Sequence, residues 1–393
     1  MITIDGSYGE GGGQVLRTSL SLSALQGEAV RIENIRAKRP KPGLQAQHLT
    51  GVLAIAQICN AELRGAELGS QTLTFAPQSP PQAGDYAFDV AEARKGGSAG
   101  STSLVFQTLL LPLALAEGDS HLTIRGGTHV AWSPPFHYLQ QVYLPTLARM
   151  GIEATVEIKQ WGWYPIGGGE IRARVRGRGL RAGKNITSQF APAGFVIQPP
   201  DRRIANPARA KVILSIPYPL TPINLVERGE LRRLWGISAL SNLPAHIGQR
   251  QKSQAERLLR ERGFKPKIEI VDAPSPGQGT VVFLVAEFEN VLAGFTSYGA
   301  RGKRAEKVAE EACQEFVQYY DSGQALDRHL ADQLILPMSL AAGQSGFTTC
   351  EVTRHLLTNV EVVQRLMEVK AEMEGKRCRI AHTSDAGDRA GGE

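Results

Sequence analysis

The sequence predicts an α/β (α+β) fold in which a helix–strand–helix arrangement recurs three times and a smaller α/β domain interrupts the series. Three octets, LSLSALQG (20–27), LPLALAEG (111–118) and LPMSLAAG (336–343), each end an apolar, helix-like segment with a glycine suited to the left-handed C-terminal position of a helix. Each octet is followed by a strand candidate and a second helix, whereas residues 185–278 break this rhythm. Helix, glycine and strand also follow one another by chance in α/β chains, so this alternative stays open on the pattern alone.

The elements follow in order along the chain. The strand candidates after the octets are AVRIENI (29–35), SHLTIRGG (120–127) and GFTTCEV (346–352). The second helices are expected over 43–61, 134–151 and 353–373. The interrupting segment contains a strand candidate (234–243), a basic helix (245–263) and another strand candidate (266–273). Gly263 ends the basic helix, and arginines enrich its last turn.

These elements predict the domain organisation. We expect a large domain over 1–184, a small inserted α/β domain over 185–278, the continuation of the large domain over 279–375, and a partly frayed tail over 376–393.

Composition limits the class of protein. The chain has 393 residues, 42% hydrophobic and 21% charged, and its 44 Lys and Arg against 38 Asp and Glu give a net charge of +6. This mild excess favours an anionic partner without separating RNA from a phosphorylated metabolite. The four cysteines show no zinc-ligand or disulfide spacing, and no signal peptide or apolar span is recognisable. We therefore expect a cytoplasmic protein with no membrane contact.

The glycine-rich segment DGSYGEGGGQVLRTSLSLS (5–23) is the first candidate site. It lacks the Lys-Ser/Thr pair of a P-loop, and Gln14 stands where a dinucleotide fingerprint needs its last glycine. A backbone that lets an anion approach the start of a helix remains, with Glu10 inside it. A carboxylate beside a phosphate suggests a bridging metal ion. The alternative is a tight turn with a solvated acid.

A basic segment follows this glycine run. RAKRPKPGLQAQHL (36–49) supplies several cations, and with Arg17 it suggests a guanidinium cradle for phosphate. Two more glycine-rich segments are WYPIGGGEI (163–171) and RKGGSAGSTSLVFQ (94–107).

Taken together, the motifs resemble the RNA 3'-terminal phosphate cyclase family. They are DGSYGEGGGQVLRTSLSLS, RPKPGLQAQHL, GGSAGSTSLVFQTLLLPL, GGTHVAWSPPFHY, YPIGGGE, SNLPAHI, HLADQLILPMSLA and TRHLLTN, in order from residue 5 to about 360. The resemblance implies ATP-dependent conversion of an RNA 3'-phosphate into a 2',3'-cyclic phosphodiester, with release of AMP and pyrophosphate. It also implies three repeats of a two-helix, four-stranded unit with a small inserted domain.

By the same resemblance, His355 is the nucleophile that carries AMP, and Glu10 is the ligand of Mg²⁺ or Mn²⁺. The implied nucleotide-binding residues are Gln107, Pro134, His329, Leu330, Ala331, Asp332 and Gln333. The residues placed to hold the RNA terminal phosphate or the triphosphate are Arg17, Arg36, Arg39, Gln47 and His48, and the sequence does not apportion them.

Residue chemistry is consistent with these roles. A neutral imidazole attacks phosphorus near pH 7, which suits a relay of the adenylyl group. His329, Asp332 and Gln333 stand at i, i+3 and i+4 and therefore share one face of a helix. Without the resemblance, a histidine such as His355 on a helix would be read as a packing residue.

RNA recognition is expected at the strand end, its terminal phosphate and its 2'-hydroxyl. The basic helix over 245–263 is read as a solvated face in preference to a contact with the RNA backbone. The stretch 185–226 is longer and richer in proline than the family pattern, and Trp161 and Ile166 replace expected basic residues. Two other functions stay open: a silent RNA-binding or ribosome-assembly protein on the same scaffold, and an enolpyruvyl transferase. A homodimer is also left open.

Overall fold

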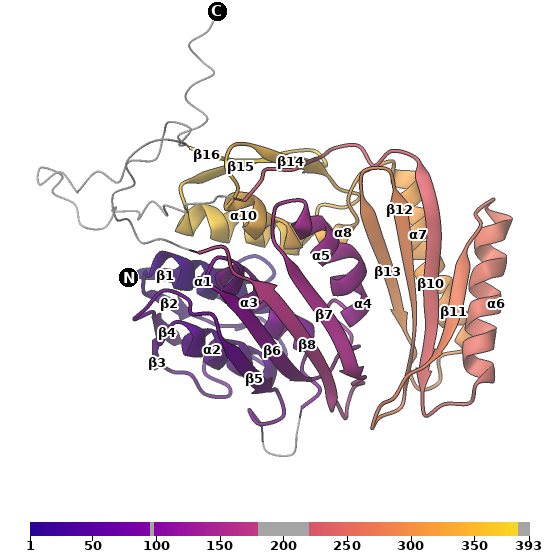
Figure 1. The fold of residues 1–393 in the computed structure, drawn as a ribbon, viewed down its shortest axis with the longest axis horizontal. Coiled ribbons are helices and arrows are strands. Elements are labelled where there is room, and N and C mark those ends of the chain that lie inside the picture. The colour runs from indigo at the N-terminus through magenta and orange to yellow at the C-terminus, as the bar shows by residue number, and fades with distance from the viewer. Residues whose placement is uncertain (95–97, 180–219, 384–393) are drawn as a thin grey trace, which may run out of the picture.

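The computed structural model describes residues 1–94, 98–179 and 220–383 and arranges them in four four-stranded sheets with helices (Figure 1). The first sheet, ordered β1-β2-β4-β3, comprises β1 (Ile2–Asp5), β2 (Val30–Glu33), β3 (Glu62–Arg64) and β4 (Leu73–Ala76), with helices α1 (Gly13–Gln26) and α2 (Ala46–Ile58). The second, ordered β5-β6-β8-β7, comprises β5 (Asp85–Asp89), β6 (Asp119–Gly126), β7 (Ala154–Gln160) and β8 (Gly169–Arg176). Its helical segments are α3 (Thr102–Ala114), α4 (Phe136–Tyr138), the π-turn η1 (Leu139–Tyr143) and α5 (Leu144–Ala148).

The third sheet draws on two distant parts of the chain. Its order is β15-β16-β14-β9, from β9 (Asn224–Leu225), β14 (Ser345–Thr348), β15 (Val369–Glu374) and β16 (Arg377–His382), with α8 (Arg328–Gln333), α9 (Ile335–Ser339) and α10 (Arg354–Leu366). The fourth sheet lies between these parts in sequence. Its order is β11-β10-β12-β13, from β10 (Leu231–Ser241), β11 (Lys267–Asp272), β12 (Gly279–Phe288) and β13 (Leu292–Tyr298), with α6 (His246–Glu261) and α7 (Ala305–Ser322).

Three of the sheets share one pairing pattern. In each, the first strand runs parallel to the second, the second antiparallel to the fourth, and the fourth antiparallel to the third. The fourth sheet differs, because its first strand, β10, lies between β11 and β12. The mixed α/β class expected from the sequence is therefore confirmed.

The helices of the first three sheets meet in the interior. α1 contacts α2, α3 and α10, so segments from the beginning and the end of the chain lie side by side. α1 can pack on several sides because it alternates leucine with serine, and Ser19, Ser21 and Ser23 are as buried as its leucines. The small hydroxyl side chains allow close helix packing, and the hydroxyl of Ser21 donates to the Thr108 carbonyl of α3 at 2.9 Å.

The fourth sheet is covered by α6 and α7 on one face (Figure 1). Near the end of β7, Trp161 and Trp163 form a small separate core with Ala239, Ala273 and Val281 of this sheet. The indole of Trp163 donates to the Ser241 hydroxyl at 2.8 Å. The buried indoles therefore join the fourth sheet to the second.

Two of the expected boundaries cut across sheets of the structure. A boundary at residue 278 would separate β11 from β12, although both pair with β10 in one sheet. A tail beginning at residue 376 would remove β16, which pairs with both β14 and β15. The residues of a strand do not reveal which other strands it will pair with. The expected helix over 353–373 also ends early, because α10 stops at Leu366 and β15 follows. Residues 185–219 of the expected insert lie outside the described residues.

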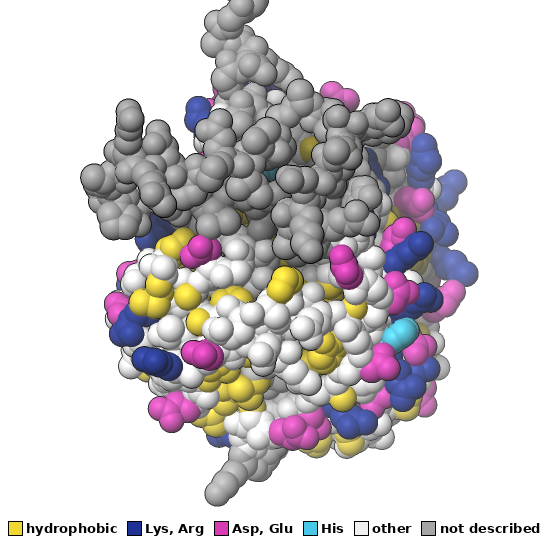
Figure 2. Space-filling view, turned by 60° about the vertical axis from the view of Figure 1, so that its left-hand side comes forward, with side chains coloured by type: hydrophobic (Ala, Val, Ile, Leu, Met, Phe, Trp, Pro, Cys, Tyr) yellow, Lys and Arg dark blue, Asp and Glu magenta, His cyan; other side chains and the backbone are white. Residues whose placement is uncertain are grey.

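The basic helix α6 is ion-paired. Arg250 and Arg262 pair with acids of α7, while Arg257 and Arg260 pair with acids of α6 itself. These pairs favour the solvated-face interpretation. Basic and acidic side chains are interspersed on the face shown in Figure 2. Within the described residues, no helix combines the length and apolar character needed to cross a membrane.

Candidate functional site

The glycine bend between β1 and α1 is held against the opposite end of the chain. Gly9 and Gly11 adopt the left-handed region, with φ of +59° and +62°. A Cβ on Gly9 would lie 2.2 Å from Oγ1 of Thr358 on α10, so only glycine fits there. The same hydroxyl accepts a hydrogen bond from the Glu10 amide at 3.1 Å. The glycines therefore let the bend close onto α10.

This closure brings Glu10 to His355. One carboxylate oxygen of Glu10 lies 3.1 Å from Nδ1 of His355, and the other contacts the guanidinium of Arg39. The Glu10 side chain is 15% exposed and that of His355 is 47% exposed. Burial, followed by the charges of Arg17, Arg39 and His329, lowers the pKa of His355 to about 4. The ring is therefore neutral at pH 7, with one nitrogen facing Glu10.

The start of α1 lies beside this contact. Gly12 is the N-cap and provides no side-chain hydrogen bond to the first turn. A Cβ on Gly13 would meet the His48 ring and the Arg17 guanidinium within 3.0 Å. Burial lowers the pKa of Arg17 to about 10, partly opposed by Asp332, so Arg17 remains a cation at neutral pH. Helix amides and a buried guanidinium together suit an anion.

The other expected phosphate ligands surround this point. Arg36, with φ of +55°, donates from its guanidinium to the Lys41 carbonyl at 3.1 Å, and burial lowers its pKa. The carboxamide oxygen of Gln47 accepts from the Ser101 amide at 2.9 Å, which ties α2 to the start of α3. Arg36 and Gln47 therefore have partners within the chain that hold them in place.

His48 is a buried, neutral ring. Its Nδ1 accepts from the Gln45 amide at 3.1 Å, which leaves the proton of the neutral ring on Nε2. Burial lowers its pKa to about 3, with Arg36 and Arg17 adding to the effect. His48 can therefore donate a hydrogen bond from Nε2 but does not supply a charge.

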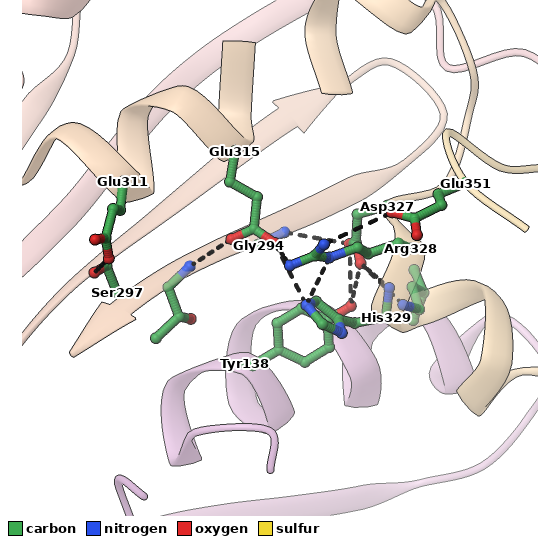
Figure 3. Close-up of polar contacts among 11 residues, drawn as sticks. Tyr138, Gly294, Ser297, Glu311, Glu315, Asp327, Arg328, His329 and Glu351 are labelled. Carbon is green, nitrogen blue, oxygen red and sulfur yellow. Dashed lines mark hydrogen bonds and ion pairs between the residues drawn. The ribbon is translucent and has the colours of Figure 1, made fainter. Parts of the chain in front are cut away.

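The expected nucleotide-binding helix is α8. Asp327 caps it, because one carboxylate oxygen accepts from the amides of His329 and Leu330 at 2.8 and 2.9 Å. The ring of His329 is half-exposed, and its Nε2 lies 3.4 Å from Glu315 of α7 (Figure 3). The contact with Glu315 and the charge of Asp327 outweigh burial and raise the pKa of His329.

The remaining nucleotide candidates divide by exposure. Leu330 and Ala331 are fully buried, so neither residue presents surface to a ligand. Gln107 donates from its carboxamide to that of Gln333, which links α3 to α8. Burial raises the pKa of Asp332 to about 7, against the opposing charges of His329 and Arg17.

Pro134 lies half-buried in the loop before α4. The Tyr138 ring, one turn further on, meets the His329 ring edge-on at 6.4 Å.

Glu10 alone does not make a metal centre. Its two oxygens face His355 and Arg39. Among the described residues, no cluster of three or more His, Cys, Asp or Glu side chains is arranged to hold a metal ion. The residues present therefore do not fit a metal ion held by the protein alone.

Several residues of this region were not identified from the sequence. They are Tyr138, Glu315, Asp327, Thr358 and Asn359, whose side-chain amide donates to the Asp332 carbonyl at 2.7 Å. The caps Asp327 and Thr353 carried a recognisable signal, because each directly precedes a helix and accepts a hydrogen bond from its first turn. Thr358 contacts Glu10, 348 residues away in the sequence, and Glu315 contacts His329 on a different helix, so neither contact left a local pattern.

Comparisons with known proteins agree with the arrangement of these motifs. A family model described as RNA 3'-terminal phosphate cyclase matches residues 8–373. The chain is 49% identical over 365 residues to the RNA 3'-terminal phosphate cyclase of Nostoc punctiforme, covering 93% of this chain and 94% of that protein. The protein of the same name from Methylococcus capsulatus is 46% identical over 391 residues, covering 100% and 98%. That from Archaeoglobus fulgidus is 39% identical over 382 residues, covering 97% and 100%.

The solved enolpyruvyl transferase NikO from Streptomyces tendae aligns with 41% of this chain and 30% of its own, at 18% identity and a TM-score of 0.23. A likeness of that size carries no argument about function. The family match and the three relatives cover most of the chain, and the chain therefore belongs to the RNA 3'-terminal phosphate cyclase family.

Proposed function

We propose that this enzyme converts the 3'-terminal phosphate of RNA into a 2',3'-cyclic phosphodiester, using ATP and carrying the adenylyl group on His355. The observation that carries the proposal is the contact between Glu10 and His355 beside the uncapped start of α1. It joins the first and last motifs of the family, which lie more than 340 residues apart along the chain.

The chemistry requires activation because ring closure would otherwise expel oxide from phosphorus. In the proposed sequence, a ring nitrogen of His355 attacks the α-phosphorus of ATP and pyrophosphate leaves. An oxygen of the RNA 3'-phosphate then attacks the same phosphorus, and the bond to His355 breaks. Finally, the 2'-hydroxyl attacks the terminal RNA phosphorus, loses its proton to a base and displaces AMP. Each step has a good leaving group.

His355 has the properties that this role needs. Its lowered pKa keeps the ring unprotonated at pH 7, as a nucleophile must be. A proton on Nδ1, the ring nitrogen that lies 3.1 Å from Glu10, would leave the lone pair on Nε2. Glu10 would thus fix the tautomer and the orientation of the ring.

Phosphate binding is proposed at the start of α1. Arg17 and Arg39 would supply cations here, since the charges of both lower the pKa of His355. Arg36, Gln47 and His48 line the same region from α2 and the segment before it. Cations already in place stabilise the charge that develops on a transferring phosphoryl group.

The nucleotide is proposed to bind along α8, which the contacts with α10 keep beside His355. His329, Asp332, Gln333 and Gln107 would contribute side chains to this site. Leu330 and Ala331, which are fully buried, would hold the helix in place from below, and Pro134 would provide an apolar wall.

The requirement for Mg²⁺ or Mn²⁺ stays a prediction. Glu10 would be its one carboxylate, so the ion would take most of its ligands from phosphate oxygens and water. A metal ion bound there would neutralise phosphate charge. Cytoplasmic location also stays a prediction, and homodimer formation stays open.

We propose that the three sheets with a common pairing pattern are repeats of one two-helix, four-stranded unit. The fourth sheet with α6 and α7, from Leu231 to Ser322, would be the inserted domain. This division keeps each sheet whole.

The test is covalent labelling. The purified protein is incubated with α-³²P-labelled ATP and a divalent ion, and the labelled residue is located by peptide mapping. We expect AMP on His355, no label in His355→Ala, and unchanged labelling in His121→Ala, whose ring lies on the exposed face of β6 and pairs with Asp85. A wild-type protein without label would favour the silent RNA-binding alternative. Label retained in His355→Ala but lost in His329→Ala would exchange the two roles.

A further inference from the structure

Glu315 belongs to the fourth sheet unit but faces the nucleotide helix of the third. It lies on α7, and one of its oxygens accepts from the Thr296 amide of β13 at 3.3 Å. The other oxygen, Oε1, lies 3.4 Å from Nε2 of His329 and 3.0 Å from the guanidinium of Arg328 (Figure 3). The Glu315 side chain is only 21% exposed. A carboxylate fixed at both oxygens and largely shielded from water is a rigid partner for the ring.

The backbone of His329 is fixed independently of its ring. Asp327, which is 2% exposed, accepts from the His329 amide and from the Tyr138 hydroxyl, the latter at 2.9 Å. The amide of Gly294 on β13 approaches the second carboxylate oxygen at 3.4 Å. Backbone amides of β13 therefore hold both acids: Asp327 at the start of α8 and Glu315 beside the His329 ring.

The charges around the ring have opposite effects. Glu315 and Asp327 favour the protonated ring, whereas burial and Arg328, whose Nε lies 3.3 Å from the same ring nitrogen, disfavour it. Asp332 lies on the same helix, and His355 interacts with His329 across the site. The acids prevail, so His329 holds a proton at a higher pH than an ordinary histidine.

We propose that Glu315 is a positioning residue of the ATP site: it fixes the His329 imidazole through Nε2 and leaves the exposed edge of the ring to donate to an adenine nucleotide. The inserted domain thereby completes a site that its own sheet does not contain. This inference rests on the proposed function, because it requires that His329 contacts ATP.

Glu315→Gln tests the proposal, because it keeps the acceptor for Thr296 and removes the charge. Glu311→Gln is the matched control: Glu311 lies one turn earlier on α7 and binds Ser297 and Lys303, away from His329. We expect Glu315→Gln to raise the KM for ATP in single-turnover labelling about tenfold, as for the loss of a hydrogen bond to a charged group. The maximal rate should change less, and Glu311→Gln should match the wild type. Equal KM values for Glu315→Gln and the wild type would overturn the proposal.

Two further readouts separate positioning from general damage. If Glu315 acts through His329, Glu315→Gln adds nothing to the KM of His329→Ala, whereas a full additive loss would contradict the proposal. In NMR titration of the unliganded protein, the His329 ring should titrate at a lower pH in Glu315→Gln than in the wild type, and an unchanged midpoint would oppose the proposal. The titration does not depend on catalysis. Absence of AMP labelling in the wild type would therefore overturn the proposed function alone.

Discussion

Replacing Gly9 by alanine tests why the chain begins with a glycine bend. Both Gly9 and Gly27 have positive φ, +59° and +69°, so alanine at either position incurs a similar backbone strain of about 1 kcal/mol. The surroundings differ. At Gly27 nothing lies within 4 Å of the new Cβ, whereas at Gly9 the Thr358 hydroxyl would lie 2.2 Å away. Gly27→Ala is therefore a control for strain without a clash.

The clash cannot be relieved by rotating Thr358. Its hydroxyl donates to the Arg354 carbonyl at 2.6 Å and accepts from the Glu10 amide at 3.1 Å, so it is held on two sides. Since Cβ contacts below 3.0 Å essentially do not occur, the bend must move away from α10 by nearly an ångström. A displacement of about 1 Å at a reacting group can lower the rate by about a hundredfold.

The assay compares the two variants in single-turnover AMP labelling and in urea unfolding. We expect both to lose about 1 kcal/mol of unfolding free energy from strain, but only Gly9→Ala to lose about a hundredfold in labelling rate. If Gly9→Ala labels at the wild-type rate, or if Gly27→Ala is equally impaired, the bend does not act by holding Glu10 against His355.

Three further predictions concern single groups. Tyr138→Phe removes the hydroxyl that donates to buried Asp327, and it should lower the free energy of unfolding by about 2 kcal/mol in a urea titration. Tyr298→Phe is the control, because the buried Tyr298 hydroxyl has no hydrogen-bond partner among the described residues. It should leave the free energy of unfolding unchanged or raise it. The pKa of His355 is lowered to about 4, so its ring is protonated and loses the attacking lone pair only as the pH falls through that value. The labelling rate, measured after brief pH jumps, should therefore decline near pH 4. A midpoint near the ordinary value of 6.5 would contradict the proposed environment of the ring. Arg17→Ala should reduce the labelling rate by about a hundredfold, and a rate within threefold of the wild type would show that Arg17 does not bind the reacting phosphate.

The parts of the fold predicted from the sequence are those with local signals. The basic helix expected over 245–263 is α6 (His246–Glu261). The strand expected over 234–243 overlaps β10, which ends at Ser241. The helix is marked by its terminating Gly263, and both segments are short enough for a local window to contain their signals. The boundary expected at residue 278, which cuts across the fourth sheet, has the opposite origin. β12 is as apolar as any core strand, but its pairing with β10 depends on contacts that no window includes.

The candidate site divides in the same way. Glycine density and nearby cations made the bend recognisable, and the spacing of His329, Asp332 and Gln333 on one helix face was readable by periodicity. The partners of these side chains could not be predicted in this way, because Glu315 reaches His329 from a different helix, α7.

In α8, different residues hold the backbone and the His329 ring. The helix can therefore be well fixed and still expose one face. Asp327 fixes the start of α8 by accepting hydrogen bonds from its first amides. Asp327 is buried and does not belong to the exposed face of the helix. His329 then needs only one additional contact to set its ring, and Glu315 supplies that contact from a different sheet. In the proposed nucleotide site, a change at Glu315 on α7 would alter the charge state of His329 while the capped backbone of α8 stays in place. A site built from α8 alone would have to change both together.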